Sequence, residues 1–370
     1  MTGASARLVL PDFPWDSLAE LARRASEYPG GTVDLSVGTP VDPVPEVLRD
    51  ALQSASALPG YPATHGTPEL RQAVVVALGR RYGVTGVPAE AVLPTMGSKE
   101  LVAWLPTLLG LGPGDVVALP ELAYPTYEVG ARLAGATAVR LSDDEPAVPG
   151  TRLRWLNSPC NPTGDVTPAG VLASVVRQAR EIGAVVASDE CYLALGWEAQ
   201  PVSVLHPQVS GGDHSGLLAV HSLSKSSNLA GYRAGFVAGD PELVAGLLAV
   251  RKHAGMMVAR PVQQAMVAAL SDDTHVARQR DRYARRRQLL APALEDAGLR
   301  VQRSQGGLFL WCTAGESCWD TVTRLADIGV LVAPGEFYGP AGARHVRVAL
   351  TATDERIAAV VRRLGLLPQL

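Results

Sequence analysis

Short apolar runs alternate with stretches of helical periodicity along most of the chain. Each run is four to six residues long and is bounded by polar residues, glycine or proline, which is typical of a buried strand. The clearest runs cover residues 92–95, 115–120, 153–156, 184–187, 217–221 and 234–238. Because helical stretches separate most of these strands, the pattern predicts an α/β fold.

The intervening stretches carry helix signals. Thr67 and Pro68 supply an N-cap and a first-turn proline for a helix with Leu70, Val74 and Leu78 on successive turns. Similar signals predict helices over residues 100–110, 167–182 and 320–328, and helices from 240 to about 297. Toward the two ends of the chain, short strands are predicted over residues 33–37, 330–333 and 345–350. A chain of 370 residues exceeds an average domain, so one large α/β domain and a smaller one are expected.

A polar loop between the predicted strands at 217–221 and 234–238 carries the clearest candidate catalytic residues. Lys225 follows the strand, Ser222 and Ser224 precede it closely, and Arg233 lies eight residues after it. Hydroxyl and guanidinium groups in this arrangement could hold a phosphate dianion beside a reactive amine. The alternative is a solvated lysine and an arginine in a surface ion pair.

Polar residues at other strand ends add candidates. A glycine-serine turn at Gly97 and Ser98 enters a helix N-terminus, where backbone N–H groups suit an anion. Tyr124 could stack on a planar ring, and the guanidinium of Arg347, which alternates with apolar residues on its strand, could bind a carboxylate. Taken singly, such residues are also typical of turns, caps, buried aromatics and edge strands.

Four motifs follow one another along the chain. They are N-P-T-G at 161–164, D-E-C-Y at 189–192, S-x-S-K-x-x-x-x-x-G-x-R-x-G from residue 222 and G-G-x-F-x-W at 306–311. Together they resemble the class I and II aminotransferases of fold type I, which depend on pyridoxal 5′-phosphate. The resemblance implies a mainly parallel seven-stranded sheet between helices, plus a smaller α/β domain. It places the large cofactor-binding domain at residues 40–283 and the small domain at 12–39 and 284–370.

The resemblance also implies roles for individual residues. Lys225 would bind the cofactor covalently and move protons, while Asp189 would keep the pyridine nitrogen protonated. Tyr192 and Asn161 would contact the phenolic oxygen, and Tyr124 would stack on the ring. The remaining cofactor-binding residues would be Gly97, Ser98, Lys99, Ser222, Ser224 and Arg233.

Substrate and assembly follow from the same resemblance. Gly38, Asn161 and Arg347 would bind the substrate, and Arg347 would pair with its α-carboxylate. Tyr61 would reach the cofactor phosphate of a neighbouring subunit. The protein is therefore expected to be a homodimer with sites at its interface.

Segments outside the shared motifs suggest a narrower assignment. FPWDSL, DLSVGTPVDPV, GYPATHGT, WLPTLLGLGPGD and RKHAG resemble the actinobacterial N-succinyldiaminopimelate aminotransferases of lysine biosynthesis. Glutamate would be the amino donor and N-succinyl-2-amino-6-oxopimelate the acceptor. The candidate cations for the distal carboxylates of the acceptor are Lys99, Arg251, Lys252 and Arg260. The alternatives are an aminotransferase for another amino acid, a carbon–sulfur lyase, and a non-catalytic ligand-sensing protein of the same fold.

Composition narrows the classes of partner. The net charge of −3 argues against a protein that binds nucleic acid or acidic lipid, and six arginines in residues 278–287 have the spacing of a solvated helix face. No apolar run reaches the roughly 20 residues of a membrane span. The four cysteines form neither a C-x-x-C pair nor a zinc pattern, which predicts core residues in a reducing compartment and no metal site. A cytoplasmic protein that acts on small molecules is expected.

Overall fold

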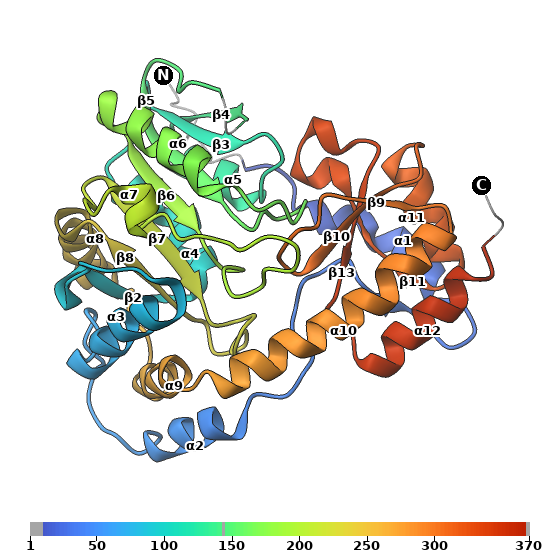
Figure 1. The fold of residues 1–370 in the computed structure, drawn as a ribbon, viewed down its shortest axis with the longest axis horizontal. Helices are drawn as coiled ribbons and strands as arrows, with labels where there is room; N and C mark the ends of the chain where they lie inside the picture. The colour runs from blue at the N-terminus through green and yellow to red at the C-terminus, as the bar shows by residue number, and fades with distance from the viewer. Residues whose placement is uncertain (1–9, 143–144, 368–370) are drawn as a thin grey trace, which may run out of the picture.

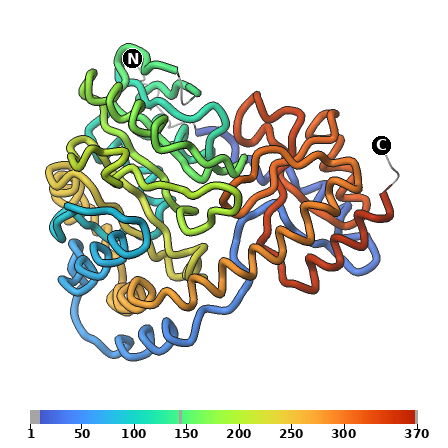
Figure 2. Tube along the Cα trace, in the orientation of Figure 1, coloured from blue at the N-terminus to red at the C-terminus, as the bar shows by residue number. Residues whose placement is uncertain are grey.

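A computed structural model describes residues 10–142 and 145–367 of the chain. Figure 1 shows a larger part built on one sheet and a smaller part to its right, formed by both ends of the chain. The long helix α10 (Thr274–Asp296) runs from one part to the other. Figure 2 shows the same course as a tube, with an N-terminal segment beside this helix.

The larger part contains a seven-stranded sheet in the order β2-β8-β7-β6-β5-β3-β4. Its strands are β2 (Val92–Met96), β3 (Val116–Pro120), β4 (Thr137–Leu141), β5 (Thr151–Asn157), β6 (Val185–Asp189), β7 (Leu217–Ser222) and β8 (Ala234–Gly239). Only β8 runs antiparallel to its neighbours in this sheet, and the other pairs are parallel. The predicted mainly parallel seven-stranded sheet is confirmed.

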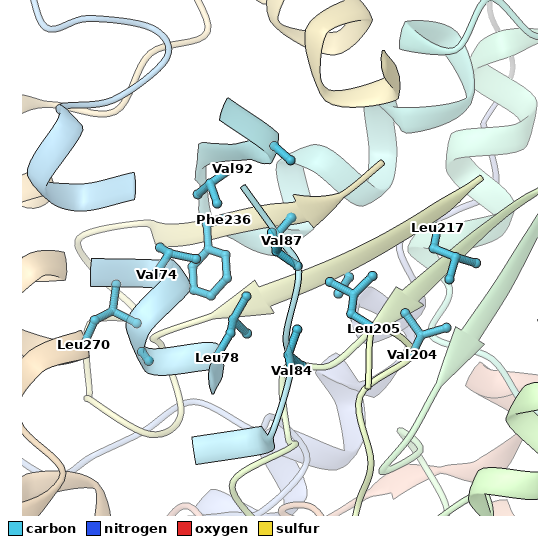
Figure 3. Packing of buried hydrophobic residues seen from close by; sticks show 14 of the residues in the cluster. Val74, Leu78, Val84, Val87, Val92, Val204, Leu205, Leu217, Phe236 and Leu270 are labelled. Atoms are coloured by element: carbon cyan, nitrogen blue, oxygen red, sulfur yellow. The ribbon is translucent and has the colours of Figure 1, made fainter. Parts of the chain in front are cut away.

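Helices cover both faces of this sheet. They are α3 (Pro68–Tyr82), α4 (Gly97–Leu108), α5 (Thr126–Ala134), α6 (Ala169–Glu181), α7 (Pro207–Ser210), α8 (Pro241–Ala254) and α9 (Arg260–Ser271). Successive strand residues enter different cores, since Phe236 packs with α3, α6 and α9, whereas Val237 packs with α4, α5 and α8. Figure 3 shows the first of these cores, where Val74 and Leu78 of α3 pack beside Phe236. Apolar burial on both faces is typical of parallel sheets.

The smaller part draws on both chain ends. Its strands are β1 (Val33–Asp34), β9 (Arg300–Gln302), β10 (Phe309–Thr313), β11 (Val330–Leu331), β12 (Ala333–Pro334) and β13 (Val346–Ala349). Its helices are α1 (Ala19–Ser26), α11 (Cys318–Asp327) and α12 (Asp354–Leu364); α12 packs against α10, and α1 packs against α11. One core joins Leu18 and Leu35 to Leu310 and Ile357. The exact domain boundaries, 40–283 for the large domain and 12–39 with 284–370 for the small domain, stay a prediction.

The remaining elements are short or lie at the edges. They are α2 (Glu46–Ser54) and the 3-10 helices η1 (Pro14–Leu18), η2 (Ala89–Ala91), η3 (Gly335–Tyr338) and η4 (Pro340–Gly342). Within residues 10–142 and 145–367, no helix combines the length and hydropathy needed to cross a bilayer.

Three sequence expectations about local structure were wrong. The strand predicted over residues 330–333 is two strands, because β11 pairs with β1 and β12 pairs with β13 in a different sheet. The pairing with β11 also limits the predicted strand at 33–37 to Val33 and Asp34. The arginine-rich face of α10 is not wholly solvated, since Arg286 is buried and pairs with Asp42 and Asp354.

Candidate active site

A cavity of about 360 Å³ opens where three strands of the large sheet end. Asn157, Asp189 and Ser222 are the last residues of β5, β6 and β7, which are neighbours in the sheet. Carboxyl ends of parallel strands commonly form binding sites. The cavity is lined by Phe13, Trp15, Val37, Gly38, Thr39, Ser98, Lys99, Tyr124, Tyr127, Asn157, Asn161, Asp189, Cys191, Tyr192, Ser222, Ser224, Lys225, Arg233, Phe309 and Arg347. Apart from the candidate cations for the distal carboxylates, the predicted site residues that do not line it are Gly97 and Tyr61.

Lys225 lies just beyond the end of β7 and faces this cavity. Its ammonium group donates a hydrogen bond to the backbone carbonyl of Gly38. The pKa of Lys225 is lowered to about 8, chiefly by burial and also by the nearby guanidinium groups of Arg347 and Arg233, while Cys191 and Asp189 oppose the shift. The amine therefore becomes neutral at a much lower pH than an exposed lysine, which suits a nucleophile or base.

Asp189 is a buried carboxyl group, 6% exposed. It accepts hydrogen bonds from the Tyr127 hydroxyl at 3.0 Å and the Cys191 backbone N–H at 3.2 Å. Burial raises the pKa of Asp189 even though these hydrogen bonds lower it. A cation bound in the cavity beside Asp189 would stabilise its ionised form.

Arg347 lies on β13 and is also buried. Its guanidinium donates to the Asn161 side-chain oxygen at 2.7 Å and to the Ser36 carbonyl at 2.6 Å, and it lies 3.9 Å from the centre of the Phe309 ring. Its Nε is buried without a hydrogen-bond partner among the described residues. A buried guanidinium in the lining of a cavity is suited to an anionic ligand, most simply a carboxylate.

Hydroxyl and backbone groups form the other end of the cavity. The Ser222 hydroxyl accepts a hydrogen bond from the Ser224 N–H at 3.1 Å, and α4 begins at Gly97 without a side-chain cap. Gly97 has φ of +73°, and a Cβ added to it would lie 2.3 Å from a nitrogen of Arg233. Gly97 therefore leaves room for the arginine. Free N–H groups at a helix start, hydroxyls and a guanidinium together suit a phosphate.

The candidate cations for a distal carboxylate lie in different places. Lys99 lines the cavity, with its ammonium 5.6 Å from the centre of the Phe13 ring and 6.0 Å from that of Tyr124. Arg251 was a wrong candidate, because its buried side chain pairs with Glu100 at 2.8 Å. Lys252 and Arg260 are exposed and outside the lining.

Tyr61 lies away from the cavity and is 94% exposed. Within one chain it makes no contribution to the lining, so its predicted role depends on a second subunit.

Several lining residues were not predicted as site residues. Asn157 donates to the Asp189 carbonyl at 2.9 Å and accepts from the Asn161 N–H at 2.7 Å, so it orders two predicted residues. Cys191 was expected to be a core residue, but its sulfur lies in the lining, 3.1 Å from the Ser98 hydroxyl. Cys191 and Phe309 lie inside motifs, and Asn157 lies four residues before N-P-T-G, which was the available signal. The other residues, Phe13, Trp15, Val37, Thr39 and Tyr127, reach the cavity through tertiary folding.

Metal ligands do not gather in the part of the chain that the structure describes. No group of three or more histidine, cysteine, aspartate or glutamate side chains there is placed to hold a metal ion.

Residues 31–364 match the family described as aminotransferase class I and II. This chain belongs to that family. It is 64% identical over 365 residues to a probable aminotransferase, Rv1178, of Mycobacterium tuberculosis, which covers 98% of this chain and 86% of the relative. It is 59% identical over 358 residues to the 4-dedimethylamino-4-oxo-anhydrotetracycline transaminase OxyQ of Streptomyces rimosus. That match covers 96% of this chain and 99% of the relative.

A solved structure of a probable N-succinyldiaminopimelate aminotransferase from Thermus thermophilus is also similar. It is 30% identical to this chain, has a TM-score of 0.83, and covers 95% of this chain and 99% of its own. The two relatives above carry other names, so the comparisons identify an aminotransferase without identifying its acceptor.

Class I and II aminotransferases use pyridoxal 5′-phosphate, and this chain is a pyridoxal-phosphate-dependent aminotransferase. The cavity fits the cofactor by its own chemistry. The buried Asp189 suits a protonated ring nitrogen, the uncapped start of α4 suits a phosphate, and Lys225 supplies the amine.

Proposed function

We propose that this aminotransferase transfers the amino group of glutamate to N-succinyl-2-amino-6-oxopimelate, a reaction of lysine biosynthesis. The observation that carries the proposal is one cavity that holds Lys225, with its lowered pKa, and the buried guanidinium of Arg347. Both substrates present an α-carboxylate to Arg347 and a reacting carbon to Lys225.

Pyridoxal phosphate, when bound, supplies an electron sink for the bonds at the substrate Cα. Asp189 would keep its ring nitrogen protonated, and Lys225 would take the proton from the substrate Cα and deliver it to the cofactor carbon C4′. Tyr192 and Asn161 would contact the phenolic oxygen, and Tyr124 would stack on the ring. The phosphate would be held by Gly97, Ser98, the backbone N–H of Lys99, Ser222, Ser224 and Arg233, with Gly38 beside the substrate.

Two observations support the succinylated acceptor. Lys99 lies in the lining between aromatic rings, where a cation can meet the distal carboxylates of an extended substrate. The similarity to the probable N-succinyldiaminopimelate aminotransferase of Thermus thermophilus supports the same assignment. Lys99 is then the cation that we expect to distinguish the succinylated acceptor from shorter oxo acids.

A second candidate is an amino transfer to a polycyclic ketone. The 59% identity to the tetracycline-pathway transaminase favours it, as do the aromatic side chains of Phe13, Trp15, Tyr124 and Phe309 in the cavity lining. Such a ketone has no need of a cation at Lys99.

An acceptor screen with glutamate as donor tests the proposed function. N-succinyl-2-amino-6-oxopimelate should give a higher kcat/KM than short 2-oxo acids or a polycyclic ketone. Lys99→Ala should lower that value about tenfold or more by removing an ion pair, with the exposed Lys252→Ala as the matched control. Preference for the polycyclic ketone would favour the second candidate, and release of ammonia and pyruvate from a cysteine conjugate would indicate a lyase.

Arg347→Ala should impair both half-reactions. Loss of a charged, bidentate partner is expected to lower kcat/KM by about 100-fold for the donor and for the acceptor, mainly through KM. Steady-state kinetics with each substrate varied in turn would measure this, with the exposed Arg344→Ala as control. A defect confined to one substrate would indicate a different carboxylate partner.

We also propose that the active unit is a two-fold dimer in which Tyr61 reaches the cofactor phosphate of the neighbouring subunit. Its 94% exposure in one chain leaves it free to do so. Mixing Tyr61→Phe with Lys225→Ala subunits, each weakly active alone, should restore activity, because every heterodimer would carry one intact site and one site with both defects. A fully active monomer in sedimentation experiments would contradict the dimer.

A further inference from the structure

One face of α10 carries polar side chains where apolar ones are usual. His275, Gln279, Tyr283 and Arg286 are spaced by four, four and three residues, so they lie on one side of the helix. None of the four is more than 6% exposed. Because burying polar groups is costly unless they are hydrogen-bonded, their partners show what this face does.

The N-terminal half of this polar face contacts the lysine loop, which we define as residues 225–228. A ring nitrogen of His275 lies 2.9 Å from the Ser227 hydroxyl, and the Tyr283 hydroxyl donates to the Lys225 backbone carbonyl at 3.4 Å. Between them, the Gln279 side-chain oxygen accepts from the Asn228 amide at 3.0 Å.

Asn228 has a backbone that needs such support. Its φ is +53°, in the left-handed region that residues with side chains rarely adopt unless their surroundings hold them there. Its side-chain amide is buried and also donates to the carbonyl of Pro43 at 3.3 Å. The two hydrogen bonds of this amide fix the loop three residues after Lys225.

Gln279 also contacts the segment that carries Gly38. Its amide donates to Asp42 at 2.8 Å, and Asp42 accepts two hydrogen bonds from Arg286, at 2.6 and 2.9 Å. Burial alone would raise the pKa of Asp42, but these hydrogen bonds outweigh it, so the carboxylate stays ionised. Arg286 in turn donates to Asp354 of α12 at 2.7 Å.

We propose that Gln279 is a positioning residue for Lys225. One end of its side chain holds the lysine loop through Asn228, and the other end holds residues 38–42 through Asp42. The carbonyl of Gly38 accepts the hydrogen bond of the Lys225 ammonium, so Gln279 fixes both partners of that contact from outside the cavity. The inference rests on the proposed role of Lys225.

Gln279→Met tests the proposal, because methionine has a similar length and forms neither hydrogen bond. With pyridoxal phosphate bound, kcat should fall about tenfold while KM for glutamate changes less than about twofold, since the amine is displaced but the carboxylate site is intact. The pH midpoint of the bound cofactor's absorbance should move. Gln288→Met, an exposed position on the same helix, should change neither quantity.

Hydrogen exchange of the cofactor-free protein gives a readout that needs no activity. Amides of the lysine loop, residues 225–228, should exchange about tenfold faster in Gln279→Met, whereas those of the central sheet should not change. If the wild-type protein proves inactive with glutamate, that result contradicts the proposed function alone. The exchange measurement would still test the role of Gln279.

Asn228→Gly supplies a second variant in case Gln279→Met folds poorly. Glycine accepts the left-handed backbone but removes the side-chain hydrogen bonds, so kcat should again fall with KM little changed. Unchanged kcat in both variants, or faster exchange throughout the protein without a selective loss in the lysine loop, would overturn the proposal.

Discussion

Lys225→Ala is expected to lower transamination by at least about 10⁴-fold and to leave a folded protein. Alanine can neither bond to the cofactor nor carry the proton from the substrate Cα, and general acid–base groups contribute up to about that factor. Pyridoxal phosphate should still bind weakly, because the hydroxyl groups and Arg233 remain. Absorbance of the bound cofactor and steady-state turnover measure the two effects.

The matched control is Lys252→Ala, on the exposed surface of α8. It should keep wild-type turnover and the wild-type absorbance spectrum. An active Lys225→Ala variant would remove this lysine from the mechanism and would leave its lowered pKa as a consequence of burial only.

Asp189→Asn should lower kcat by about 100-fold or more while cofactor affinity changes much less. Asparagine can still accept the hydrogen bond of the Tyr127 hydroxyl, but it is neutral and cannot keep a ring nitrogen protonated. Rapid measurement of the glutamate half-reaction would separate the rate from cofactor binding. Asp213→Asn, an exposed position in the same part of the fold, is the control. Equal rates for Asp189→Asn and wild type would exclude this carboxylate from the site.

Much of the candidate site could be predicted because it follows from strand order. Asn157 and Asp189 are direct partners in the pairing of β5 with β6, and β7 lies next to β6. Strand-end residues more than 30 positions apart in the sequence therefore meet at one edge of a parallel sheet. Local patterns of apolar and polar residues were sufficient to locate these strand ends.

Contacts between distant segments could not be predicted in this way. Arg251 resembled a free cation in the sequence, yet its guanidinium pairs with Glu100 of another helix. Phe13 and Trp15 reach the cavity from the N-terminal segment, and nothing in their local pattern separates them from residues of an ordinary apolar helix face. The buried polar face of α10 was interpreted as solvated at Arg286, because helical spacing alone does not show which groups lie opposite.

The central claim is that the cofactor binds to Lys225 in this cavity, and chemical trapping tests it directly. The sequence contains three lysines, Lys99, Lys225 and Lys252, so the site of attachment can be assigned without ambiguity. Borohydride reduction of the protein with bound pyridoxal phosphate, followed by digestion and peptide mass spectrometry, should find the phosphopyridoxyl group on Lys225 at about one per chain. A label on Lys99 or Lys252 instead, or no label in a protein that transaminates, would contradict the account.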